Sequence, residues 1–207
     1  RRWPEGPDEG MRVLAIGAQV HFCSWPEADN LVRVIEMTSL AERYRPFLGQ
    51  RIARLVWRPI TCDTPGTVSD LGKPTIEFSG AASLFFEESG EILLTWMSGA
   101  GGDCHLAGAE LSAWHPFSLD LIHASPEEPW GHFMGARLRQ VSLFRDSLAP
   151  GEIVAIRHEF DSSPPGADLW LGVGRRQKMH EGDDLVICIG PPVNVDELEL
   201  VETIGAE

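Results

Sequence analysis

The sequence predicts an α+β protein that is mainly β, with two tandem pseudo-repeated modules, each a short helix followed by antiparallel strands. Three observations predict this fold: a string of residues that recurs at a constant spacing, strand-like runs after each copy, and acidic Gly turns between apolar runs. The chain has 207 residues, 43% of them hydrophobic, and is therefore long enough to bury a substantial core.

The recurring string occupies 39–52 and again 125–138, and its two copies align without a gap. Each copy begins with Ser-x-x-Glu, the pattern of a capping box, in which both side chains bond backbone N–H groups at a helix start. An aromatic residue and a Phe follow at a spacing that places them on one face of a short helix. Gly49 and Gly135 then stand where that helix should end, because glycine adopts the left-handed conformation at low cost.

Each copy leads into an extended run, and in the second half polar and apolar residues alternate there as in a half-buried strand. Further on, each half has an acidic Gly turn between two apolar runs, which is a hairpin signal. The segments that we match in this region are Leu84–Phe86 with Leu169–Leu171, and Gly90–Trp96 with Gly182–Cys188. A helix, a strand, a loop and a terminal hairpin are therefore expected in each half.

Four regions follow from this pattern. Residues 1–10 are rich in Pro and Gly, and form either a flexible segment or residues that precede a natural start at Met11. Residues 11–100 are the first β-rich module, which opens with a strand pair or with a strand and a turn, and residues 101–121 are an irregular connector. Residues 122–207 are the second module with an acidic tail, where Leu198, Leu200 and Ile204 predict one more strand, an edge strand guarded by its charges.

The net charge of −14 argues against direct binding of nucleic acid or of an anionic membrane, because both require a positive surface. The region from Glu181 to the end holds eight carboxylates and no Lys or Arg. No apolar run approaches the roughly 18 residues that span a bilayer. The four cysteines are scattered without a C-x-x-C pair, so we expect reduced thiols and a cytoplasmic location.

Catalytic signatures are weak. Asp103, Cys104 and His105 could supply a thiol nucleophile and its base, but neighbouring residues on a strand face opposite ways. His21 and Cys23 have ligand-like spacing without a second pair, so no metal site is predicted. We therefore expect no catalytic residue and no cofactor.

The pattern Phe47-Leu48-Gly49-Gln50-Arg51-Ile52, followed by the run from Leu84 to Leu94, resembles small bacterial proteins of the immunity type found in polymorphic toxin systems. The shared pattern is a short helix, a strand, a long loop and a hairpin. The resemblance implies a binding protein, and it carries over no catalytic or binding residue.

The charge and the resemblance predict a non-enzymatic inhibitor, an immunity or antitoxin-type protein that neutralises a basic toxin enzyme. Its expected contacts are the acidic turns, namely Glu87, Glu88 and Glu91 in the first half and Glu181, Asp183 and Asp184 in the second. The alternative is a small-molecule-binding or hydrolytic β protein with a site between the two modules. That site would use Asp103, Cys104, His105, Trp114 and His115 of the connector.

Overall fold

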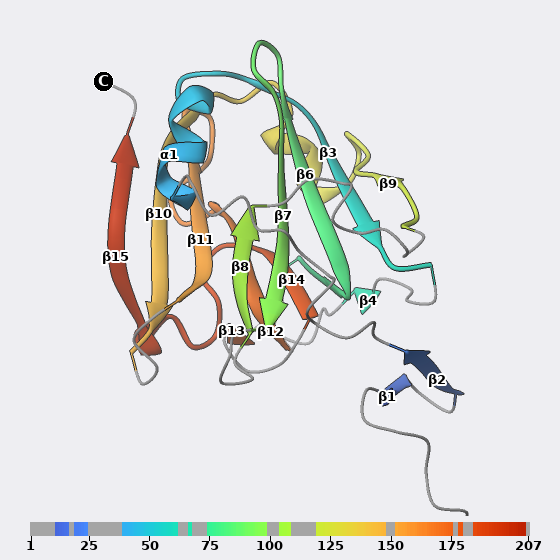
Figure 1. Cartoon of the computed structure of the whole chain (residues 1–207). Coiled ribbons are helices and arrows are strands. Elements are labelled where there is room, and N and C mark those ends of the chain that lie inside the picture. Colours follow the sequence, from blue (N-terminus) through green and yellow to red (C-terminus); the bar gives the residue numbers. More distant parts are fainter. Residues whose placement is uncertain are drawn as a thin grey trace, which may run out of the picture.

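The chain folds as two antiparallel β-sheets that face each other, with the helical segments of 40–47 and 129–133 at one end (Figure 1). The computed structural model describes residues 11–16, 19–24, 39–61, 66–67, 74–98, 104–108, 119–147, 152–175, 178–179 and 184–205. The prediction of a mainly β, α+β protein is therefore confirmed.

The helical elements are short. They are the α-helix α1 (Leu40–Tyr44) and the 3₁₀ helices η2 (Arg45–Phe47), η4 (Pro129–Phe133) and η5 (Val195–Glu197). The strands of the first half are β1 (Met11–Ile16), β2 (Gln19–Ser24), β3 (Ile52–Pro59), β4 (Gly66–Thr67), β5 (Thr75–Phe78), β6 (Gly80–Phe86), β7 (Gly90–Ser98) and β8 (Cys104–Gly108). Those of the second half are β9 (Ile122–His123), β10 (Leu138–Asp146), β11 (Ile153–Phe160), β12 (Leu169–Arg175), β13 (Lys178–Met179), β14 (Asp184–Ile189) and β15 (Leu198–Gly205).

The strand order explains where the core lies. One sheet has the order β8-β7-β6-β3-β9, and the other has the order β15-β10-β11-β12-β14-β5-β4 with β13 paired to β12. Strands β1 and β2 pair with each other, which decides for the strand pair over a strand and a turn. The main core takes alternate residues from the facing sides of both sheets, among them Leu55, Leu84, Leu171 and Ile187.

The two copies of the recurring string meet each other backbone to backbone. Gly49 N–H donates to Leu138 O at 2.8 Å, and Gly135 N–H donates to Ile52 O at 2.7 Å. Ile52 N–H donates to Ala136 O at 3.0 Å, and Leu138 N–H donates to Gln50 O at 2.9 Å. Each of these two bonds reaches the residue that follows the glycine of the other copy. Every bond has a counterpart at the spacing of the repeat, so the two copies are related locally by an approximate two-fold axis.

The glycines that end the helical segments behave as the sequence predicts. Gly49 has a φ of 78° and Gly135 a φ of 79°, both in the left-handed region. The capping box at the first copy is also confirmed: Ser39 N–H donates to Glu42 Oε2 at 3.0 Å, and Glu42 N–H donates to Ser39 Oγ at 3.2 Å. In the second copy the capping box is only half formed: Ser125 N–H donates to Glu128 Oε2 at 2.9 Å, but Ser125 Oγ accepts from Glu127 N–H, and a 3₁₀ helix follows in place of an α-helix.

The observed strand pairing differs from two of the predictions made from the sequence. Strand β5 of the first half pairs with β14, so a strand from 11–100 completes the sheet of the second half. The connector is also not irregular throughout, because β8 within it pairs with β7 along five residues. Each of the two sheets therefore contains strands from both halves of the chain. The boundaries of the two predicted modules stay a prediction.

The downstream alignment of the halves also changes. Phe86 pairs with Ile52, as Phe160 pairs with Leu138, so β6 corresponds to β11. The match of Leu84–Phe86 with Leu169–Leu171 is therefore wrong, because the latter lie one strand further on, in β12. Apolar strands are similar in composition, and pairing partners rather than local sequence decide which strands correspond.

Candidate functional surfaces

The turn between β6 and β7 presents two of the predicted contact residues, Glu87 and Glu88, which are both exposed. The turn is held in place by the side chain of Gln50. Its Oε1 accepts from the backbone N–H of Glu88 at 3.2 Å and of Ser89 at 3.0 Å. The backbone of this turn is fixed while the two carboxylates face solvent, so it suits a contact surface.

Glu91, the third predicted contact of this turn, is committed to a network on the outer face of the five-stranded sheet. Ser83 Oγ donates to Glu91 Oε1 at 2.6 Å, and Arg58 Nη2 donates to the same oxygen at 3.2 Å. Arg58 Nε also donates to Ser83 Oγ at 2.7 Å. Arg58 is only 8% exposed and Ser83 is 0% exposed, so this trio stabilises the sheet and gives no substrate access to the hydroxyl.

The second acidic turn is only partly described. Asp184 Oδ1 accepts from Ser79 Oγ at 2.6 Å in a partly buried bond that links the end of β14 to the β5–β6 junction. Glu181 and Asp183 lie outside the described residues. The prediction of a partner contact at Asp184 is weakened by this bond, because a carboxylate that accepts an internal hydrogen bond is less available to a partner.

Most residues of the alternative site lie outside the residues that the structure describes. This holds for Asp103, Trp114 and His115. Cys104 and His105 belong to β8, where they pair with Ser98 and Met97, but their side chains are not described. Most of this set lies outside the described residues, so the site between the modules stays a prediction.

A buried polar pair joins α1 to the eight-stranded sheet. Tyr44 O–H lies 2.6 Å from His158 Nε2, and His158 Nδ1 lies 3.1 Å from Leu169 O. The carbonyl can only accept, so Nδ1 carries the proton and Nε2 accepts from Tyr44. Burial lowers the pKa of His158 to about 4 and raises the pKa of Tyr44 well above its usual value. Both side chains are fully buried, so the pair is a structural element and not a reactive site.

Among the described residues, the exposed large apolar side chains fall in two places, Leu121 and Ile122 before η4, and Val193, Leu200 and Val201 in the C-terminal segment. Strand β15 forms one edge of the eight-stranded sheet, and among the described strands it pairs with β10 alone (Figure 1). Leu200 is 55% exposed and Val201 is 48% exposed. The predicted edge position of this strand is therefore confirmed, and the protective role of its charges stays a prediction.

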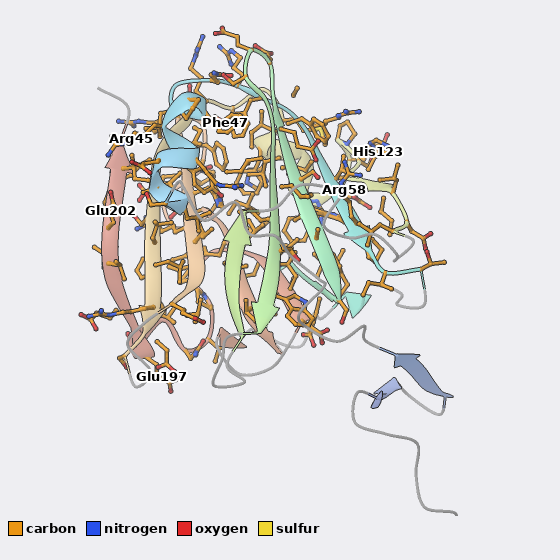
Figure 2. The ribbon with its side chains drawn as sticks, in the orientation of Figure 1. Arg45, Phe47, Arg58, His123, Glu197 and Glu202 are labelled. Atoms are coloured by element: carbon orange, nitrogen blue, oxygen red, sulfur yellow. The ribbon has the colours of Figure 1, made fainter. Side chains whose placement is uncertain are left out.

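Acidic side chains surround this apolar surface. Glu199 and Glu202 are exposed on β15, and Asp196 and Glu197 are exposed on η5 just before it; Figure 2 shows Glu202 along the strand and Glu197 near its start. We call these four residues with Leu200 and Val201 the β15 surface. Arg145 donates to Glu199 through Nε at 3.0 Å and Nη2 at 2.7 Å, which lowers the pKa of that carboxyl and raises the pKa of Arg145.

Sequence reasoning placed the contacts on the hairpin turns and missed the β15 surface as the leading candidate. Part of the signal is in the sequence, where four carboxylates within 196–202 stand beside Leu198, Leu200 and Val201, but the exposure of Leu200 and Val201 comes from the structure. Alternation alone could not identify them, because it does not state which of two sheet edges stays unpaired.

The part of the chain that the structure describes contains no group of three or more His, Cys, Asp or Glu side chains that could hold a metal ion. None of its helices has the length and apolar character needed to cross a membrane. Comparison with protein-family models, with curated proteins and with solved structures gave no match.

Proposed function

We propose that this protein is a non-enzymatic inhibitor of the immunity type, which binds a basic protein such as a toxin enzyme and masks it. The observation that carries the proposal is the β15 surface, where Leu200 and Val201 are exposed among carboxylates. An exposed apolar patch with a charged rim is typical of a protein-binding surface.

The net charge of −14 supports a basic partner, because complementary charge accelerates encounter and disfavours wrong partners. The turn with Glu87 and Glu88 adds a second exposed acidic site. Charge alone gives little affinity, and the apolar side chains of β15 supply the burial that a stable complex needs.

The state of the polar side chains in the core also favours binding over catalysis. Ser83 and His158 have the chemistry of a nucleophile and a base, and each is 0% exposed with its hydrogen bonds made inside the fold. A catalytic group must reach its substrate, so these two side chains serve stability.

The test starts from the partner itself. Proteins retained by the immobilised chain at low salt are eluted at high salt, and the eluted partner is purified and assayed for enzymatic activity with and without this protein. We expect a basic enzyme that loses activity as the chain approaches one equivalent. A partner that is not basic, or that stays fully active in the complex, would overturn the proposal.

A charge-reversal pair locates the surface. Glu202→Lys should slow association at low salt by about tenfold, because it reverses a charge at the centre of the contact. Glu127→Lys is the matched control, since Glu127 is exposed, lies in the turn before η4 and changes the net charge equally. Equal slowing by both variants would mean that the overall charge matters and that the β15 surface does not.

A further inference from the structure

We infer that the partner binds by strand addition: a basic strand of the partner pairs with the open edge of β15 and extends the eight-stranded sheet. This inference rests on the proposed function and specifies how the same surface would bind. Its ligand class is an extended segment in which apolar residues and Lys or Arg alternate.

The first support is the geometry of the edge. β15 has eight residues and pairs with β10 from Gln140↔Gly205 to Asp146↔Leu198. A strand that pairs on one side leaves backbone N–H and C=O groups on its other side, and these groups form a template for another strand. Residues 199–203 are all exposed, so side chains of this protein do not cover the edge there.

The second support is what the edge displays. The register with β10 shifts between Leu143 and Phe144, so Val201 has no partner opposite it and forms a bulge. Bulges re-aim a side chain, and here Val201 stays 48% exposed next to Leu200. An added strand would cover both apolar side chains, which otherwise remain in water.

The charge of the β15 edge favours a basic partner strand over a second copy of this chain. If two copies of this chain paired through β15 with Leu200 opposite Val201, Glu199 would lie opposite Glu202 in both directions. Arg145 offsets the charge of Glu199, so the main opposition to such a pair is the net charge of −14 that both copies carry. A basic strand instead gains an opposite-charge pair at Glu202, so the edge favours a basic partner over a second copy.

The probe is a synthetic peptide in which Val and Arg alternate, with blocked ends. Its controls are the same sequence N-methylated throughout, which keeps the charges and removes the backbone donors, and a Val–Glu peptide of equal length. Binding to the full chain is measured at low salt by calorimetry, and the contacted residues are mapped by amide chemical shifts.

We expect the Val–Arg peptide to bind, with shifts concentrated at 198–205 and on β10. N-methylation should weaken binding by about tenfold or more, because a strand pair depends on backbone hydrogen bonds. Glu202→Lys should weaken it similarly, while Glu127→Lys should change it by less than about twofold. The Val–Glu peptide should not bind.

Three results would overturn strand addition. The methylated peptide could bind as tightly as its parent, no peptide could bind, or the shifts could fall away from β15. A dimer in sedimentation that Glu202→Lys changes would also overturn it, because the edge would then be occupied by a second copy. None of these results decides whether the native partner is inhibited, so the proposed function is tested separately by the activity assay.

Discussion

The two copies of the recurring string occupy equivalent places but meet different neighbours. Tyr44 of α1 reaches His158 of β11, whereas its counterpart Trp130 of η4 packs edge-on against Trp57 of β3, with ring centroids 5.6 Å apart. Leu84 is the counterpart of His158, because it pairs with Leu55 as His158 pairs with Val141. One half has an apolar contact where the other has a buried hydrogen bond.

Backbone geometry and core chemistry are therefore separable in this fold. Both copies keep the same glycine conformation and the same reciprocal backbone bonds. The polar pair is tolerated because Tyr44 O–H and both nitrogens of His158 all have partners. A buried polar group without a partner would be destabilising, so the exchange had to change two residues together.

The largest expected effect tests whether the apolar part of the repeat is equally important in both halves. Phe133 is 0% exposed and packs on Phe160, while Phe47 is 7% exposed and packs on Phe86. Phe133→Ala should lower the free energy of unfolding by about 4 kcal/mol, and Phe47→Ala by about 3 kcal/mol, because the deeper ring leaves the larger cavity. Urea denaturation measures both, and a reversed order would show that fractional exposure does not rank the two sites.

The second prediction concerns pH and belongs to the second half alone. The folded pKa of His158 is about 4, below its usual value of 6.5, so the unfolded chain binds more protons between these values. The free energy of unfolding should therefore fall by about 3 kcal/mol as the pH drops from 6.5 to 4, at roughly 1.4 kcal/mol per unit. The stabilisation is fully present above pH 6.5.

The control for the pH effect is His158→Leu, which installs the residue found at the equivalent Leu84. Carboxylates also titrate in this range, so the comparison is the difference between the two pH profiles. The free energy of unfolding of the variant should depend less steeply on pH, because the contribution of His158 is absent. Parallel profiles from pH 6.5 to 4 would show that His158 protonates as easily in the folded chain as in the unfolded one.

The third prediction tests whether the polar pair acts as a unit. Tyr44→Phe leaves the His158 acceptor buried without a donor, and His158→Leu leaves the Tyr44 hydroxyl without an acceptor, so each should cost about 1–3 kcal/mol. The double variant copies the apolar character of the first half and should cost less than the sum of the two. A double-mutant cycle measures the coupling. Additive effects would mean that the hydrogen bond adds nothing beyond packing.

The sequence predicted those parts of the fold that local chemistry controls. The glycines at 49 and 135, the Ser39–Glu42 capping box and the β1–β2 pair depend on neighbouring residues, and all are confirmed. The membership of β5 in the far sheet could not be predicted, because it depends on its pairing with β14 more than a hundred residues away. Likewise, nothing local to Tyr44 indicates His158, since the two are 114 positions apart in sequence.

The candidate surface also combines features that local sequence predicts with features that depend on distant residues. The acidic tail and its edge strand were predictable from alternation and charge. The hydrogen bonds of Glu91 with Arg58 and of Asp184 with Ser79 could not be predicted, because the partners are 33 and 105 positions apart in sequence. The hairpin acids therefore divide into exposed residues and residues that hold the sheets together, which only the pairing of strands can decide.

The smallest expected effect compares the two capping sites. Ser39→Ala removes a hydroxyl that accepts from Glu42 N–H at the start of α1, and should cost about 1 kcal/mol. Ser125→Ala removes an acceptor for Glu127 N–H in an exposed turn before a 3₁₀ helix, so solvent can replace it and the cost should be about half as large. Thermal or urea unfolding at neutral pH, with both variants measured side by side, resolves the difference between the two losses of stability. Equal costs would mean that the second copy also depends on its serine, and that the change from α-helix to 3₁₀ helix leaves the energetics of capping intact.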